Sequence, residues 1–356
     1  MSGSLPSGVH FSSHAAERAL VRTGPQRLWL AAFLLACAAM PWVAGDYLLG
    51  VLTLAGVTLV AVLGLQVTVG LAGQLNLGQS AFVGVGAFVA AALAGQGWSP
   101  WLCIPAAAFG AGAVSVLFGL PAVRIKGFYL ALTTIAAQIM FPIVMIRLPD
   151  RWFGGTAGLP VDPPVVFGVA ADTPRAIYWL VLAVVAVAFL GAANLGRSRI
   201  GRAFRAMRDN DIASSVIGVD LARTKILAFF AGAFYAGISG ALYAYYVRYV
   251  STDQFTLWLS VWYVGMLIVG GLHTPLGAVL GVLAITVLHE GVHAIGAKSL
   301  LLLSGISNVS GGTVFALTNV VLGGVIVLML LFEPLGLAHR WTLLKTAYRI
   351  WPYPRG

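Results

Sequence analysis

Charged residues are scarce in this chain of 356 residues: Asp, Glu, Lys and Arg make up only 9% of it, and only 11 residues are acidic. In soluble domains about a quarter of the residues are charged, so this composition excludes an ordinary soluble fold. The chain has two cysteines, and we expect no disulfide between them, because Cys37 falls in the middle of one apolar segment and Cys103 near the end of another. The nucleotide-binding pattern G-x-x-x-x-G-K-[ST] is absent, as is any Ser/His/Asp or paired-carboxylate arrangement. We therefore expect a protein that is not an enzyme and binds no ATP itself.

Apolar residues dominate instead, since 60% of the chain is hydrophobic and 43 residues are glycine. A membrane-spanning helix needs about 20 apolar residues, so the pattern predicts an all-α polytopic membrane protein with about ten transmembrane helices. The predicted spans lie near 28–44, 48–65, 78–95, 101–121, 128–146, 176–193, 226–248, 257–272, 276–295 and 313–332.

The loops between these segments are too short for a soluble domain. We therefore divide the chain into a cytoplasmic N-terminal tail (1–27), a transmembrane permease domain (28–337) and a cytoplasmic C-terminal tail (338–356). The N-terminal tail is long and rich in Ser and His for a signal sequence, so we expect the first span to be retained.

Lys and Arg predict the orientation, because they accumulate on the cytoplasmic side of membrane proteins. With ten spans and the N-terminus inside, the basic residues before residue 28, at Arg124 and Lys126, in 196–225 and after 338 all face the cytoplasm. The basic residues left outside are Arg147, Arg151, Arg175, Arg248 and Lys298. We thus expect the loop 147–175 to be external. The formal net charge of +10 is explained by topology, so no nucleic-acid partner is expected.

The densest charge lies between Gly196 and Lys225, where thirty residues contain seven of the 21 basic residues. An apolar stripe at helical spacing comprises Ile200, Ala203, Phe204 and Met207, with Arg202, Arg205 and Arg208 on the other faces. We expect Asp209 to pair with Arg205, and Asp211 to cap a second short helix that stops near Gly218. Two interpretations remain open: a helix lying at anionic lipid headgroups, or a docking helix for a cytoplasmic partner.

Amides and hydroxyls interrupt two of the predicted spans. Gly70–Leu93 contains Gln74, Asn76 and Gln79, and 127–140 contains Thr133, Thr134 and Gln138. Polar groups in hydrocarbon need partners, which favours a broken or re-entrant stretch facing protein or water. The alternatives are ordinary packing of small residues with an interfacial loop, and hydroxyls bonded to carbonyls of their own helix. We predict that these six residues lie beside a substrate path.

His289, Glu290 and His293 form a literal H-E-x-x-H, the pattern of zinc proteases. A catalytic zinc needs a third protein ligand, yet the only later acidic residue is Glu333 and the only later histidine is His339. We therefore interpret the pattern as incidental and expect no metal. An intramembrane zinc protease remains the remote alternative.

Several ordered motifs together resemble the permease subunits of branched-chain amino acid ABC transporters, the LivM type of the high-affinity hydrophobic amino acid uptake family. They are GLAGQLNLGQSAFVGVGAF (70–88), RIKGFYLALTTIA (124–136), the run 195–229, AGISGALYAYY (236–246) and GGLHTPLGAVLG (270–281). The resemblance covers roughly Leu48 to Leu337. His273 and Ala278 depart from the family pattern, which commonly has Gly and Pro there.

The resemblance implies that the charged loop is a coupling helix docking on an ATPase. Asp211, Ala213 and Gly218 match the family's pattern there, whereas Ser214 and Ser215 depart from it. The predicted coupling residues are Arg202, Arg205, Arg208, Asp209, Asp211, Ala213 and Gly218.

The implied function is import of leucine, isoleucine or valine across the bacterial inner membrane. The implied partners are a second, LivH-like permease subunit, two ABC ATPase subunits that bind ATP-Mg, a periplasmic substrate-binding protein and membrane lipid. A urea or amide importer permease is the alternative. A secondary transporter is disfavoured because we find no deep intramembrane charge for a coupling ion.

Overall fold

The computed structural model describes residues 24–125, 127–149, 153–166, 169–303, 311–333 and 335–350, and most of them are helical. The longer helices are α2 (Gly24–Val43), α3 (Asp46–Leu65), α4 (Gln79–Ala94), α5 (Pro100–Arg124), α6 (Phe128–Arg147), α8 (Pro174–Arg197), α11 (Leu221–Val247), α12 (Leu257–Gly270), α13 (Pro275–Leu303), α14 (Gly311–Phe332) and α15 (Leu337–Ile350). The shorter elements are the π-helix η1 (Gln66–Leu71), the 3₁₀ turns η2 (Gly155–Ala157) and η3 (Thr252–Gln254), the helices α9 (Arg199–Asp209) and α10 (Asp211–Val216), and the strands β1 (Leu159–Pro160), β2 (Val165–Val166), β3 (Val169–Ala170) and β4 (Tyr249–Val250).

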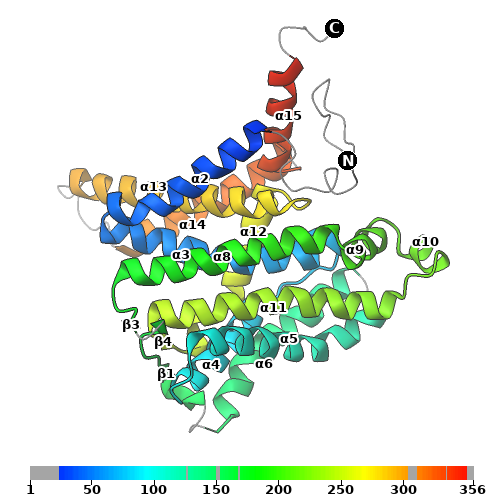
Figure 1. Cartoon of the computed structure of the whole chain (residues 1–356), viewed down its shortest axis with the longest axis horizontal. Helices are drawn as coiled ribbons and strands as arrows, with labels where there is room; N and C mark the ends of the chain where they lie inside the picture. Colours follow the sequence, from blue (N-terminus) through cyan, green and yellow to red (C-terminus); the bar gives the residue numbers. More distant parts are fainter. Residues whose placement is uncertain are drawn as a thin grey trace.

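Helices α3, α8, α11 and α5 run side by side along the long axis, with the strands at one end and α9 and α10 at the other (Figure 1). Helix α11 lies at the centre and packs against α3, α4 and α5. Glycines permit this packing: a Cβ at Gly240 would lie 2.0 Å from the Val83 carbonyl oxygen of α4, and one at Gly237 would lie 2.4 Å from the Ala107 carbonyl oxygen of α5. Small residues thus let the helix backbones touch, as is common in membrane bundles.

Among the residues that the structure describes, six helices are long and apolar enough to cross a membrane by length and composition, or seven if residues 319–332 and 337–346, bent by 49° to each other, form one span. All ten predicted segments fall on helices, but the count of ten spans is not confirmed. The clearest differences are α4, with 16 residues, and α12, with 14. Both are shorter than a full crossing because the chain before each of them is not a continuous helix.

The ends of the predicted domains are only partly described. Helix α15 occupies most of the predicted C-terminal tail. Of the predicted N-terminal tail, only residues 24–27 are described, and they form the start of α2. Among the basic residues used to predict the orientation, Arg18, Arg22, Lys126, Arg151 and Arg355 lie outside the described residues.

The predicted external loop 147–175 is tied to the end of α11 by a short antiparallel pairing. Strand β1 pairs with β4, Leu159 opposite Val250, and β2 pairs with β3. Arg248 ends α11 with a positive φ of 61°, unusual for a residue other than glycine. Its guanidinium donates to the Asp172 backbone carbonyl at 3.0 Å, so this turn fastens the loop to the bundle.

The orientation can be measured with single cysteines at exposed positions. Cys103 is fully buried, so replacing Cys37 by Ala gives a background with no reactive thiol. In that background we expect a membrane-impermeant maleimide to label Thr156→Cys in intact cells, and to label Ser215→Cys only after permeabilisation. Labelling of Ser215→Cys but not Thr156→Cys in intact cells would invert the orientation.

Candidate functional site

The start of α4 is held by side chains from three parts of the chain. The first N–H groups of a helix lack partners within it and need other acceptors. The Leu77 amide donates to Thr134 Oγ1 of α6 at 3.0 Å, and the Ala81 amide donates to Gln138 Oε1 at 2.8 Å. The Ser80 amide donates to Ser260 Oγ of α12 at 2.9 Å. These capping groups form a buried polar cluster, which comprises Asn76, Gln79, Ser80, Thr134, Gln138 and Ser260.

The polar cluster also links these helices to one another. Asn76 Oδ1 accepts from the Gly78 amide at 3.0 Å, and its Nδ2 donates to Gln79 Oε1 at 3.0 Å. Gln79 Nε2 in turn donates to the Ala61 carbonyl of α3 at 3.0 Å. Gln138 Nε2 donates to the Phe255 carbonyl, just before α12, at 2.6 Å. Residues 18 to 180 positions apart in the sequence therefore meet at one point inside the bundle.

The structure thus brings together four of the six residues predicted to line a path. The other two lie outside the polar cluster: the half-buried Gln74 donates to the Ala72 carbonyl at 3.1 Å, and Thr133 donates to the Tyr129 carbonyl of its own helix at 3.1 Å. Sequence reasoning missed Ser80 and Ser260. Ser80 directly follows the amide-rich stretch and could have been included, whereas Ser260 lies in an apolar run with no local signal.

The charged loop folds into two short helices, each capped by a side chain. Ser198 Oγ accepts from the Gly201 amide at 3.1 Å at the start of α9, and Asn210 Oδ1 accepts from the Ala213 amide at 3.0 Å at the start of α10. The prediction that Asp211 is the cap is wrong, because Asn210 has the extended backbone of a cap and Asp211 is the first helical residue. The predicted stop is confirmed, since Gly218 has a φ of +90° just after α10.

The faces of α9 follow the predicted pattern in part. Phe204 and Met207 are buried, whereas Ile200 is exposed. The predicted ion pair of Asp209 with Arg205 is wrong: Asp209 pairs with Arg208 at 2.9 Å. Arg205 instead donates to the Gly196 carbonyl at 2.9 Å, which satisfies the end of the preceding helix.

Arg208 also reaches into the bundle. Its Nη1 donates to the Gly70 carbonyl in η1 at 2.7 Å, and Gly73 lies against its side chain. Burial and the nearby Arg208 charge lower the pKa of His273, in the turn between α12 and α13, against a smaller opposing effect of Asp209. Arg208 therefore joins α9 to the stretch that precedes α4, a contact that no spacing in the sequence indicates.

Helix α10 presents an apolar surface of its own. Ile212, Val216 and Ile217 are 71%, 82% and 75% exposed, and we name them the α10 face. These three residues were not predicted from the sequence, because the arginines dominate the pattern of the loop. Solvent exposure of three neighbouring large apolar side chains is typical of a surface that another protein or the membrane covers.

The H-E-x-x-H segment lies within α13. The rings of His289 and His293 are 4.5 Å apart, and Glu290 Oε2 accepts from the Tyr47 hydroxyl of α3 at 2.5 Å. Among the described residues, no group of three or more His, Cys, Asp and Glu could hold a metal ion.

A bundle of apolar helices with a buried polar cluster and the charged helix α9 at one end is the architecture of a multi-pass membrane protein. A family model described as branched-chain amino acid transport system / permease component matches residues 47–330, and the chain belongs to this family. No solved structure matches the chain.

Curated relatives agree with this family. The chain is 27% identical over 355 residues to the high-affinity branched-chain amino acid transport system permease protein LivM of Escherichia coli (strain K12), covering 93% of this chain and 78% of the relative. It is 26% identical over 355 residues to LivM of Salmonella typhimurium, again covering 93% of this chain and 78% of the relative. It is also 28% identical over 194 residues to the autoinducer 2 import system permease protein LsrC of an Enterobacter species, covering 49% of this chain and 54% of that relative.

Proposed function

We propose that the chain is the membrane-spanning permease subunit of an ABC importer that carries leucine, isoleucine or valine across the bacterial inner membrane. The similarity to two LivM proteins over 93% of the chain carries this proposal. The permease would work beside a second, LivH-like permease subunit and receive substrate from a periplasmic binding protein. ATP-Mg would bind only to the two separate ATPase subunits.

The coupling role belongs, in this proposal, to α9 and α10. The α10 face offers exposed apolar side chains to a groove on an ATPase subunit, and the exposed Arg202 and Arg205 of the neighbouring α9 add positive charge to the same end of the molecule. Asn210 caps the start of α10 through the Ala213 amide, Asp211 is its first residue, and Gly218 follows its end. Since α9 packs against α8, α11 and η1, a movement of α10 caused by the ATPase would be transmitted to the bundle through α9.

Arg208 is the side chain best placed to transmit this movement from α9 to the bundle. We expect Arg208→Ala to lower uptake at least about tenfold, because it removes a charge-assisted hydrogen bond, worth roughly 1.5–3 kcal/mol, between α9 and Gly70. The ATPase should still bind, so ATP hydrolysis by the purified complex should continue without transport. Arg199→Ala is the matched control, because Arg199 is an exposed arginine of the same helix that makes no side-chain hydrogen bond or ion pair with another described residue. Equal uptake by both variants would contradict the role of Arg208.

The substrate path, we propose, runs beside the polar cluster and Gln74, with Thr133 at its margin. Amides and hydroxyls can bond a zwitterion without holding it as firmly as a fixed charge would, which suits release. A branched apolar tail would meet the Leu, Val and Phe side chains that surround the polar cluster.

Gln74 tests the path separately from folding, because it is half-buried and bonds only the neighbouring Ala72 carbonyl. We expect Gln74→Leu to insert normally and to lower the maximal rate of leucine uptake several-fold. Thr53→Val is the control, since Thr53 is buried in α3 and bonds only the Leu49 carbonyl of its own helix. An unchanged rate in Gln74→Leu would place the path elsewhere.

The function itself is tested by uptake of labelled leucine into cells that lack their own transporters and express the chain with its partner subunits. ATP-dependent leucine uptake supports the proposal. One relative is named for import of autoinducer 2, so autoinducer 2 is tested alongside, together with urea as the alternative substrate. Uptake of urea without leucine would overturn the substrate and leave the transporter class intact.

A further inference from the structure

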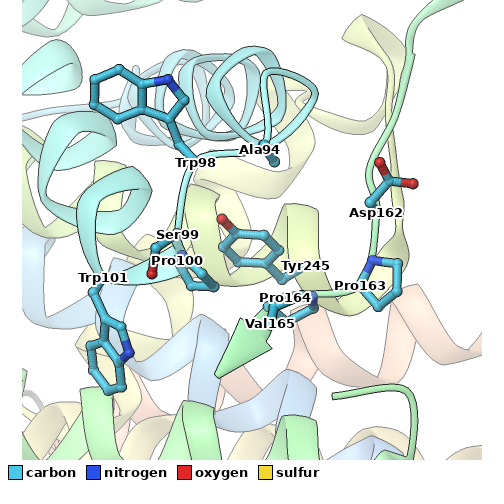
Figure 2. A pocket seen from close by; sticks show the side chains of 11 residues that line it. Ala94, Trp98, Ser99, Pro100, Trp101, Asp162, Pro163, Pro164, Val165 and Tyr245 are labelled. Carbon is cyan, nitrogen blue, oxygen red and sulfur yellow. The ribbon is translucent and has the colours of Figure 1, made fainter. Parts of the chain in front are cut away.

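A cavity of about 580 Å³ lies at the end of the bundle opposite α9 and α10. The turn between α4 and α5 forms one wall, the segment 162–165 forms the other, and Tyr245 near the end of α11 lies between them (Figure 2). This volume falls within the range of about 300–1,000 Å³ typical of sites for small molecules. The cavity is separate from the polar cluster, since none of the residues of the cluster lines it.

The walls of the cavity are mainly apolar. They comprise Ala94, Gly97, Trp98, Ser99, Pro100, Trp101, Pro163, Pro164 and Val165. Two further groups give the cavity polar character: the Asp162 carboxylate, which is exposed, and the Tyr245 hydroxyl. Asp162 has no ion-pair partner among the described residues.

The Tyr245 hydroxyl is the unusual feature of the cavity. The side chain is only 1% exposed, and its hydroxyl has no hydrogen-bond partner within the part of the chain that the structure describes. The Cys103 thiol lies beside this hydroxyl and interacts with it, but it donates its own proton to the Trp98 carbonyl at 3.5 Å, and sulfur is only a weak acceptor. Figure 2 shows the hydroxyl turned toward the Trp98–Pro100 segment. Buried hydroxyls in folded proteins nearly always have a partner, so one whose nearest polar neighbour is a thiol points to a stronger acceptor that arrives from outside.

Tryptophans at a membrane surface are common, and Trp98 and Trp101 alone would indicate no more than an interfacial belt. Such a belt does not account for a buried, unpaired hydroxyl, or for a carboxylate facing the same cavity. A ligand that satisfies both polar groups needs an acceptor for the hydroxyl, a cation for the carboxylate and an apolar body for the proline, valine and tryptophan walls. A zwitterionic apolar amino acid has all three.

We infer that this cavity is an outer binding site for a zwitterionic amino acid with an apolar side chain. The ligand carboxylate accepts from the Tyr245 hydroxyl, the ammonium group lies against the Asp162 carboxylate, and the side chain packs between Pro100 and Pro163–Val165. The site rests on the proposed function, because it supplies a staging point for the same substrate on its way to the polar cluster.

The test uses the permease–ATPase complex in nanodiscs, without ATP and without the binding protein. A diazirine analogue of leucine is photo-crosslinked to the complex, and the labelled peptides are mapped by mass spectrometry. We expect label on residues 94–101 or 162–165, competed by leucine. Tyr245→Phe and Asp162→Asn should each weaken leucine competition about five- to tenfold. The deaminated analogue 4-methylpentanoate should compete equally well with wild type and Asp162→Asn.

Asp253→Asn is the matched control, since Asp253 is an exposed carboxylate near the start of α12 that does not line the cavity. It should leave competition unchanged. Label confined to other peptides, or unchanged leucine competition in both cavity variants, overturns the site while leucine uptake by the whole transporter still supports the function. A wild-type transporter that takes up no leucine overturns the proposed function, and the ligand assigned to this cavity with it.

Discussion

Val216→Asp on α10 should abolish leucine uptake while leaving the chain correctly inserted. Val216 is 82% exposed, so the substitution costs the fold little, but it places a charge in the apolar surface that we propose docks on the ATPase. Central apolar contacts of protein interfaces contribute about 2 kcal/mol or more, which corresponds to a loss of docking of more than tenfold. Co-purification of the ATPase with a tagged permease measures docking, and labelled leucine measures uptake.

Ser215→Asp is the matched control for this experiment. It adds the same charge to the same helix at an exposed polar residue, so no apolar contact is removed. We expect this variant to keep most of its uptake. If Val216→Asp retains both its ATPase and its uptake, α10 is not the docking helix.

Gln138→Leu is expected to destabilise the whole bundle. The substitution leaves the buried Ala81 amide and the Phe255 carbonyl without their partners. Each buried polar group left unpaired costs about 1–3 kcal/mol, so the two together cost several kcal/mol. The midpoint of thermal unfolding, followed by fluorescence-detected size-exclusion chromatography in detergent, should fall by several degrees.

Thr133→Val provides the comparison on the same helix. Its hydroxyl bonds only the Tyr129 carbonyl, which already takes part in helix α6, so the midpoint should stay close to that of wild type. A midpoint for Gln138→Leu equal to that of Thr133→Val would show that the polar cluster does not brace α4.

The positions of the helices could be predicted from the sequence because long apolar runs need no tertiary information. The number of full crossings could not. Helix α4 is short because it begins inside the bundle, at caps supplied by residues far away in the chain, whereas α12 begins at exposed residues and is capped locally by Thr256. The bond between the Ser80 amide and Ser260 joins positions 180 residues apart, and neither local spacing nor composition encodes it.

The charged loop shows the same division between local and distant effects. The stop at Gly218 was predictable, because glycine tolerates the positive φ that ends a helix. The cap was not, since Asn210 and Asp211 are both good caps and only the backbone decides between them. The inward turn of Arg208 depends on how α9 packs against η1, which the amphipathic pattern does not specify.

The meeting of α4 and α12 has an electrostatic consequence for the membrane. Ser80 and Ser260 lie in the first turns of α4 and α12, and their hydroxyl oxygens are 2.9 Å apart, so the positive ends of two helix dipoles, each equivalent to about half an elementary charge, lie close together. No acidic side chain belongs to the polar cluster to offset them. Positive helix ends in a pore repel cations. On the proposed path beside the polar cluster, this positive point would admit a neutral zwitterion and repel protons and sodium ions, so transport need not dissipate the ion gradients of the cell.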